Sequence, residues 1–249
     1  MRYKEFGQKH KPVLVLIHGF GVSWKMWEPI IPQFSEAYQI FVPLLPGHDL
    51  EQASVFQSIE DCAAEITGNL KEKGVNQVHA IIGCSLGGSI TSAILALDKI
   101  TIEHAIIDGG PLVPMNPILL KLATAYRYHF VIKACRKGRN PFTKTFFPPA
   151  MAEDAQKVCA QMSDVTYFNV HRSAFNYHLP ESVATTKANV AYWYGSKEAF
   201  ICKPYIRRLS QVLPTASINE FPGFNHGELV MVEPERFVQS ALDFFHTPR

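Results

Sequence analysis

The sequence predicts an α/β fold with a mostly parallel, doubly wound sheet, and three observations support this. Short apolar stretches rich in β-branched residues alternate with stretches of helical spacing, as expected when helices cover both faces of a parallel sheet. The 249 residues are 47% apolar and 18% charged, which suits one large domain with an insertion. Over residues 111–188 the alternation lapses and only helical patterns remain, which indicates that this segment is the insertion.

The predicted elements follow from this pattern in chain order. Strands are expected over residues 2–6, 12–17, 39–44, 78–82, 104–108, 189–195 and 216–221. Helices are expected over residues 23–36, 58–73, 89–97, 203–213 and 233–245, and within the insertion over 118–136, 149–162 and 164–177. Ser23 is a typical helix N-cap and Gly74 a typical helix stop, so they mark the ends of two of these helices.

The most informative stretch is residues 78–88, where a strand runs into Gly83-Cys84-Ser85-Leu86-Gly87-Gly88 and then into a helix. A turn this tight holds the serine in a strained backbone conformation, and a Cβ two positions to either side would collide across it. The strain projects the Ser85 hydroxyl out of the sheet. The context therefore indicates a nucleophile elbow at Ser85, and a plain glycine-rich turn is the alternative. Only Ser85 has glycines two positions away on both sides, so the neighbouring Cys84 does not fit the role.

A second loop of small residues, His18-Gly19-Phe20-Gly21, follows the strand over residues 12–17. Such a loop at the carboxyl end of a strand can direct backbone N–H groups into a site. The N–H of Phe20 could hold an oxyanion together with the N–H of Leu86, which directly follows Ser85. An ordinary strand-to-helix turn is the alternative for this loop.

Three motifs together resemble the α/β-hydrolase fold family, and the resemblance covers both ends of the chain. They are His18-Gly19-Phe20-Gly21, Leu45-Pro46-Gly47-His48 and Gly83-Cys84-Ser85-Leu86-Gly87-Gly88, in this order and spacing. In that family the Pro-Gly-His segment commonly follows an Asp and precedes another Gly, whereas Leu44, Leu45 and Asp49 flank it here. His48 is therefore expected to be a structural loop residue. The resemblance implies a helical cap over residues 111–188 on a core of residues 1–110 and 189–249.

The resemblance also implies a catalytic triad with Ser85 as nucleophile. The Gly-x-x-acid position that usually carries Asp in the family is Glu198 here, just after the strand over residues 189–195. A carboxylate is needed there to hold the imidazole in one tautomer and to stabilise the imidazolium. His226 then completes the order serine, acid, histidine. Asp108, at the end of the strand over residues 104–108, is the alternative acid, because some relatives place the acid after the preceding strand.

The implied function is hydrolysis of a small-molecule acyl substrate, a carboxylic ester, through an acyl-enzyme intermediate. Serine in place of aspartate disfavours dehalogenases and epoxide hydrolases. The same triad could instead serve a C–C bond hydrolase or lyase, and the pocket could also belong to a ligand-binding relative with slow turnover. Aromatic residues of the insertion are expected partly to pack the cap and partly to line an apolar cleft: Phe130, Phe142, Phe146, Phe147, Tyr167, Phe168, Phe175 and Tyr177.

Composition argues against several other classes of protein. The net charge of +2 is spread along the chain, so no nucleic-acid or anionic-membrane partner is expected. The polar residues 1–11 do not resemble a signal peptide, and no apolar stretch approaches the ~20 residues of a membrane span. We therefore expect a cytoplasmic protein.

Cysteine and histidine usage gives no sign of a metal site. The cysteines are odd in number and scattered, which favours reduced thiols over a disulfide framework or a zinc site: Cys62, Cys84, Cys135, Cys159 and Cys202. His129, His171 and His178 could suggest a metal site, but no Cys or carboxylate cluster joins them at ligand spacing. No metal and no cofactor are expected.

Overall fold

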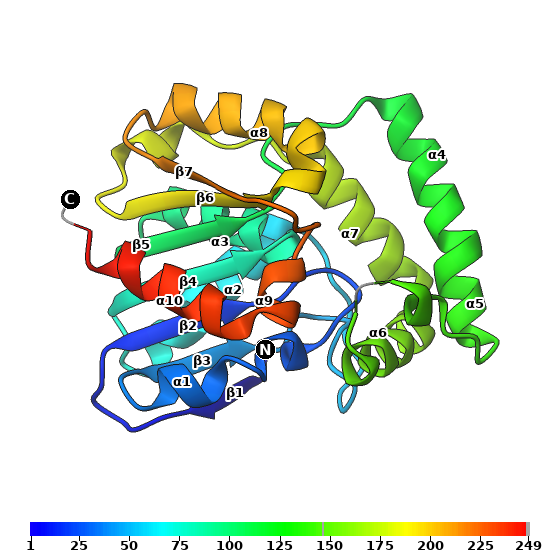
Figure 1. The fold of residues 1–249 in the computed structure, drawn as a ribbon, viewed down its shortest axis with the longest axis horizontal. Helices are drawn as coiled ribbons and strands as arrows, with labels where there is room; N and C mark the ends of the chain where they lie inside the picture. Colours follow the sequence, from blue (N-terminus) through cyan, green and yellow to red (C-terminus); the bar gives the residue numbers. More distant parts are fainter. Residues whose placement is uncertain (146, 248–249) are drawn as a thin grey trace.

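The computed structural model describes residues 1–145 and 147–247, and a seven-stranded sheet lies at its centre (Figure 1). The strand order is β1-β3-β2-β4-β5-β6-β7, and neighbouring strands are parallel except for the antiparallel pair of β1 and β3. The strands are β1 (Tyr3–Phe6), β2 (Val13–Ile17), β3 (Gln39–Pro43), β4 (Gln77–Cys84), β5 (Thr101–Asp108), β6 (Asn189–Gly195) and β7 (Ser217–Phe221). The predicted strands and the mostly parallel α/β class are confirmed.

Helices cover both faces of the sheet, as predicted for a doubly wound fold. Residues of α2 (Ile59–Glu72), α3 (Leu86–Leu97) and α8 (Ala199–Val212) bury one face. Residues of η1 (Trp24–Trp27), α1 (Ile31–Ser35), α9 (Glu228–Val232) and α10 (Pro234–Phe245) bury the other. Strand side chains alternate between the two cores, so Val15 and Ile17 belong to the first and Leu14 and Leu16 to the second. This double coverage explains why the central strands are apolar on both faces.

The single helix predicted over residues 23–36 is wrong. The chain instead forms the short 3-10 helix η1 and then α1. Pro29 lies between them and cannot donate a backbone hydrogen bond. Pro32 is tolerated because it falls in the first turn of α1. The predicted N-cap is confirmed, since the Ser23 hydroxyl accepts a hydrogen bond from the N–H of Lys25 at 3.2 Å.

Two other predicted helices differ from the structure, and one short helix is not predicted. The stretch predicted as one helix over residues 118–136 is α4 (Pro117–Arg127), a π-helical turn η2 (Tyr128–Ile132) and α5 (Lys133–Arg136). Helix α8 begins at Ala199, before the predicted start at Lys203, and it includes Pro204. Helix α9 was not predicted, because five residues are too few for helical spacing to show in the sequence.

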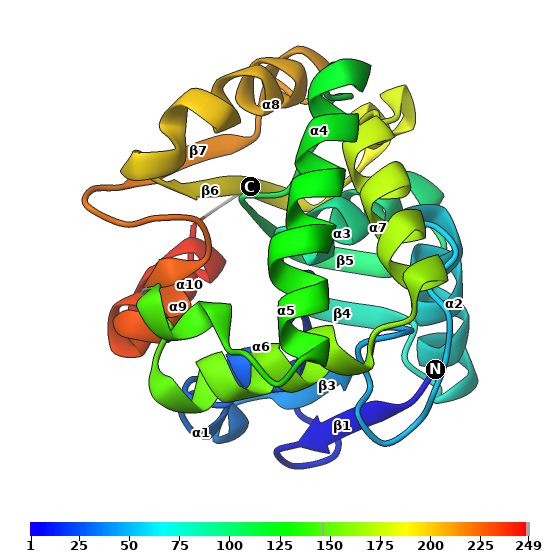
Figure 2. The same cartoon turned by 90° about the vertical axis from the view of Figure 1, so that its right-hand side faces the viewer.

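The insertion between β5 and β6 is helical as predicted, and it lies over the carboxyl ends of the parallel strands (Figure 2). Besides α4 and α5 it contains η3 (Pro141–Lys144), α6 (Pro149–Gln161), α7 (Asp164–Asn176) and η4 (Glu181–Thr185). The aromatic residue Phe146 of the prediction lies outside the described residues. That residues 111–188 act as a cap distinct from the core stays a prediction. No helix among the described residues combines the length and apolarity needed to cross a membrane.

A buried carboxylate joins the insertion to the core. Asp154 of α6 is 3% exposed and accepts two hydrogen bonds from Ser23, one from the backbone N–H at 2.9 Å and one from the hydroxyl at 2.8 Å. Ser23 ends the loop that contains Phe20. The loop is thus held between the sheet and the insertion.

Candidate active site

The turn from β4 into α3 has the geometry predicted for a nucleophile elbow. Ser85 has φ 54° and ψ −115°, a conformation that L-residues rarely adopt. A Cβ on Gly83 would collide with the carbonyl of Gly87, and a Cβ on Gly87 would collide with the carbonyl of Ile17. The Ser85 N–H donates a 2.7 Å hydrogen bond to the carbonyl of Asp108, which fixes the turn against β5. These contacts hold the Ser85 side chain at the carboxyl edge of the sheet.

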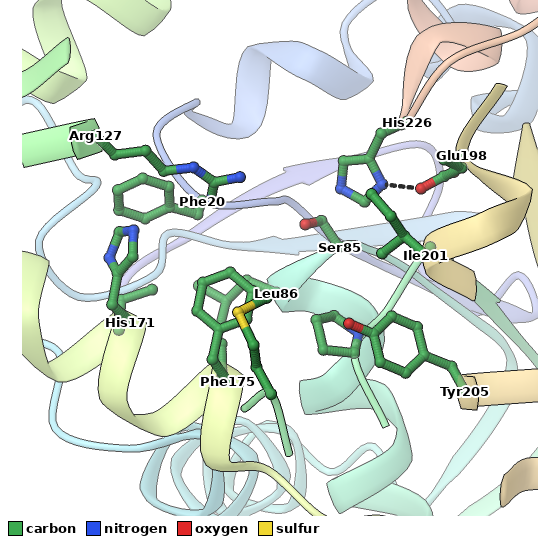
Figure 3. Close-up of a pocket in the computed structure, with 15 residues that line it drawn as sticks. Phe20, Ser85, Leu86, Arg127, His171, Phe175, Glu198, Ile201, Tyr205 and His226 are labelled. Carbon is green, nitrogen blue, oxygen red and sulfur yellow. Dashed lines mark hydrogen bonds and ion pairs between the residues drawn. The ribbon is translucent and has the colours of Figure 1, made fainter. Parts of the chain in front are cut away.

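Glu198 and His226 meet beside this serine (Figure 3). The Nδ1–H of His226 donates a 2.6 Å hydrogen bond to Oε2 of Glu198, while Oε1 accepts one from the Gly195 N–H at 3.2 Å. Glu198 closes the 3-10 turn that follows β6, and His226 lies in the loop between β7 and α9. Gly109 makes room for the imidazole, because a Cβ there would contact the ring and its φ of +62° favours glycine.

The serine and the histidine face one cavity. Figure 3 shows the Ser85 hydroxyl and the His226 ring directed toward the same space. Within residues 1–145 and 147–247 the two side chains form no hydrogen bond with each other, and such contacts are often long before substrate binds. The His226 side chain is 45% exposed, so a substrate can reach it.

Glu198 and His226 shift each other's pKa in opposite directions. Burial favours a low pKa for His226, but the hydrogen bond and negative charge of Glu198 outweigh it, and the pKa of His226 is raised. Burial favours a high pKa for Glu198, but the hydrogen bond and charge of His226 lower it overall. The pair is therefore arranged to stabilise an imidazolium.

The alternative acid, Asp108, does not form the hydrogen bond to the imidazole. Its carboxyl is 7% exposed, and the Cys84 thiol hydrogen bonds to it. Burial, followed by the nearby negative charge of Glu198, raises the pKa of Asp108 from 3.8 to about 7, although His226 acts in the opposite direction. Asp108 is thus a neighbour of the Glu198–His226 pair that is about half protonated near neutral pH.

We expect the stability of the wild-type chain relative to an Asp108→Asn variant to fall as pH rises. Because burial raises the pKa of Asp108 from 3.8 to about 7, the folded state retains a proton that the unfolded state releases. The resulting stabilisation is complete below about pH 4 and is lost as pH rises through about 7, a change of at most about 4 kcal/mol. Urea unfolding of both chains between about pH 5 and 8 measures the difference in free energy. A difference that does not vary with pH would contradict the expectation.

The two predicted oxyanion donors border the same cavity as the serine. Leu86 is the first residue of α3, so its N–H has no partner within the helix. Phe20 also lines the cavity, in the loop after β2. Beneath that loop, His18 Nδ1–H donates to the Gly19 carbonyl at 2.9 Å, and Nε2 accepts from the Leu45 N–H at 3.3 Å. The loop is thereby tied to the Leu-Pro-Gly-His segment.

His48 has the structural position that was expected. Its ring is buried, and it packs 5.4 Å from the ring of His18 and 5.8 Å from that of Phe20. Burial, assisted by His18, lowers the pKa of His48 to about 3, so the ring is neutral. His48 supports the loop from below and does not line the cavity.

The cavity has a volume of about 340 Å³ and lies between the sheet and the insertion. Its lining is mostly apolar, and it includes residues that the sequence did not single out as site residues, among them Met115, Arg127, Val170, Ala174, Ile201 and Tyr205. Phe175 is the one predicted cleft aromatic among the lining residues described. Phe142, Phe147 and Tyr167 line a smaller neighbouring cavity, and Tyr177 is buried in the core. The sequence signal for Arg127 is its helical spacing to Leu120.

The described cysteines are buried free thiols, and the metal-site interpretation of the three histidines finds no support. Burial, followed by the charges of Asp108 and Glu198, raises the pKa of Cys84, so it is not a ready nucleophile. His171 and His178 hydrogen bond to backbone carbonyls near them in sequence. Three potential ligands do converge elsewhere, since His79, Glu103 and His104 lie near the amino ends of β4 and β5, away from Ser85.

Comparison with known proteins identifies the fold and the family. The model of the alpha/beta hydrolase family matches residues 14–240. An alpha/beta hydrolase family protein from Desulfitobacterium hafniense superposes with a TM-score of 0.82 at 23% identity, covering 98% of this chain and 100% of that one. The naproxen esterase of Bacillus subtilis superposes with a TM-score of 0.76 at 20% identity, covering 98% and 87%. At these identities the structures show a shared fold.

Curated relatives align over a smaller part of the chain. A 2-succinyl-6-hydroxy-2,4-cyclohexadiene-1-carboxylate synthase of Pectobacterium atrosepticum is 32% identical over 80 residues, which are 32% of this chain and 31% of that protein. A pimeloyl-[acyl-carrier protein] methyl ester esterase of Aeromonas hydrophila is 34% identical over 106 residues, 42% and 39% of the two chains. The alignments thus span well under half of these relatives. The family model, in contrast, spans most of the sequence, and the chain belongs to the alpha/beta hydrolase family.

Proposed function

We propose that this chain is a serine hydrolase of carboxylic esters, with Ser85 as nucleophile, His226 as general base and acid, and Glu198 as the group that orients His226. The observation that carries the proposal is the 2.6 Å hydrogen bond from His226 Nδ1–H to Glu198 Oε2 beside the elbow serine. With the proton on Nδ1, the other ring nitrogen, Nε2, can accept a proton, and it lies on the side of the ring away from the carboxylate. Nε2 is therefore the atom that takes the serine proton.

In the first half of the proposed reaction, Ser85 Oγ bonds to the acyl carbon while His226 Nε2 takes its proton. The oxyanion of the tetrahedral intermediate accepts hydrogen bonds from the N–H groups of Phe20 and Leu86. The intermediate then breaks its bond to the alkoxide, which receives the proton from His226 and leaves as the alcohol. Water repeats these steps on the acyl-enzyme, releasing the carboxylic acid and returning the proton to Ser85.

Two further observations favour esters. The cavity walls are mostly apolar, which suits an acyl chain, and the hydrogen-bonded pair of Glu198 and His226 lies beside Ser85, where the ester would react. Relatives of the chain from Aliivibrio salmonicida and Aeromonas hydrophila are methyl ester esterases by name. A cytoplasmic location and a small-molecule acyl substrate belong to the same proposal.

A substrate panel tests the proposal. Steady-state turnover is measured on p-nitrophenyl butyrate, a matched thioester, an amide and a β-diketone, and a fluorophosphonate probe is mapped by peptide mass spectrometry. We expect ester turnover well above the amide, with the probe on Ser85. Turnover of the β-diketone without the ester would favour C–C chemistry instead. A labelled serine with almost no steady-state product would favour a ligand-binding relative.

A further inference from the structure

Helix α4 presents two different faces. Ile118, Leu119, Leu122 and Tyr126 are between 59% and 71% exposed on one side. Leu120, Ala123 and Thr124 are partly buried on the other, at the spacing i, i+3, i+4 of a helix side that faces the body of the protein. Arg127 occupies the next position of this series, i+7 from Leu120, and unlike the others it is exposed to solvent while it also lines the cavity. A cation therefore stands on the side of α4 that faces the cavity.

The Arg127 side chain lines the cavity that holds Ser85. Figure 3 shows it extending past Phe20 toward the centre of the cavity, on the side of Ser85 away from Glu198. Its guanidinium carbon lies 5.7 Å from the ring centroid of Phe175, a cation–π contact that steadies its direction. Arg127 and Phe20 also border a second, apolar cavity of about 170 Å³. The guanidinium thus stands at the junction of two apolar spaces.

The charge of Arg127 is not balanced by the protein. In the described part of the chain no carboxylate forms an ion pair with it, whereas Arg136, two turns later, pairs with Asp164 at 2.7 Å. The acidic residue among those that line the cavity is Glu198, which is hydrogen bonded to His226. His171, another lining residue, is neutral, because burial lowers its pKa to about 4. The end of the cavity near Arg127 therefore carries one uncompensated positive charge.

We propose that Arg127 binds a carboxylate at the far end of the acyl chain, so that the preferred substrates are monoesters of dicarboxylic acids. The inference rests on the proposed ester hydrolysis. A guanidinium matches a carboxylate through two parallel N–H···O hydrogen bonds, and the apolar lining between Arg127 and Ser85 suits the methylene chain. Figure 3 shows the guanidinium directed into the cavity past Phe20, on the side of His226 away from Glu198. Because the lining around it is mostly apolar and suits a methylene chain, we place the carboxylate on the acyl part.

The test compares two esters of equal acyl length, monoethyl adipate and ethyl hexanoate. The readout is the ratio of their kcat/KM values in wild type, Arg127→Gln, Arg127→Lys and Lys121→Gln. Lys121 is an exposed cation of the same helix outside the inward series, so it controls for general charge effects. We expect the wild type to prefer the monoester, Arg127→Gln to lower the ratio about tenfold through KM, and Arg127→Lys to retain part of it. Lys121→Gln should keep the wild-type ratio.

Two results would overturn the inference. One is an unchanged ratio in Arg127→Gln, or an equal loss in Lys121→Gln. The other is an Arg127-dependent preference for the hexanoyl ester of glycolate, because that would place the carboxylate on the alcohol side. If the wild type hydrolyses neither ester, the proposed ester hydrolysis is wrong. The carboxylate site is then tested separately, by calorimetric titration of Ser85→Ala with monoethyl adipate. Binding that weakens about tenfold on adding Arg127→Gln would then support the carboxylate site, and equal binding would refute it.

Discussion

Replacing Ser85 by alanine is expected to lower kcat for p-nitrophenyl butyrate by a factor of about 10³ to 10⁶. The variant keeps the donors of Phe20 and Leu86 and the apolar cavity but has no oxygen with which to form the acyl-enzyme. A small rate above that of the uncatalysed reaction should persist, because binding and oxyanion stabilisation remain. At φ 54° the backbone strain of an alanine should be similar to that of the serine it replaces, so the variant is expected to fold.

Cys84→Ala is the matched control for this experiment. The thiol is adjacent in sequence but points into the core, 3% exposed, where it contacts Asp108. Ester turnover in this variant should stay within about tenfold of wild type, because only a buried contact is lost. Normal turnover in Ser85→Ala combined with loss in Cys84→Ala would reverse the assignment of the nucleophile.

Glu198→Gln should lower kcat by about 10³ to 10⁴ while substrate binding changes little. A glutamine amide can donate to Nδ1, which would move the imidazole proton to Nε2, the atom that must accept the serine proton. The loss of negative charge also lowers the pKa of His226, since Glu198 is what raises it. The acid limb of the kcat/KM profile should therefore move to lower pH in the variant.

Asp108→Asn is the control for this second prediction. Its carboxyl does not hydrogen bond to His226 and is about half protonated near pH 7, so the neutral amide should alter kcat by less than about tenfold. The two variants are measured side by side on the same ester, with the pH profile of each. A severe loss in Asp108→Asn with near-normal Glu198→Gln would assign the orienting acid to Asp108 and leave the roles of Ser85 and His226 unchanged.

The features predicted correctly from sequence are those that local rules determine. The buried strands follow from continuous apolar runs, and the turn at Ser85 follows from glycines that no other residue could replace. Glu198 was predicted through family resemblance and not through local chemistry, since nothing near it in sequence indicates that it meets His226, 28 positions away. The structure adds the contact, and the role stays a proposal.

The helix errors arise where a local feature interrupts a continuous apolar pattern. The apolar pattern of residues 23–36 is helical, but Pro29 divides it, and its halves are held by packing against the sheet. Likewise the pattern over residues 118–136 does not reveal the π-helical turn after Arg127, because one extra residue in a turn changes the spacing only slightly. The spacing of seven residues from Leu120 places Arg127 on the partly buried side of the helix, where a cation is unusual.

The buried contact between Asp154 and Ser23 limits how this enzyme can be modified by exchanging parts. A helical insertion transplanted from another member of the family would have to supply an acceptor at the position of Asp154. Without one, the Ser23 N–H and hydroxyl would remain buried and unsatisfied at the end of the loop that carries Phe20. The insertion and the loop with Phe20 are thus one unit for engineering, and exchanging the insertion to change acyl preference would also change the support of the proposed oxyanion donor.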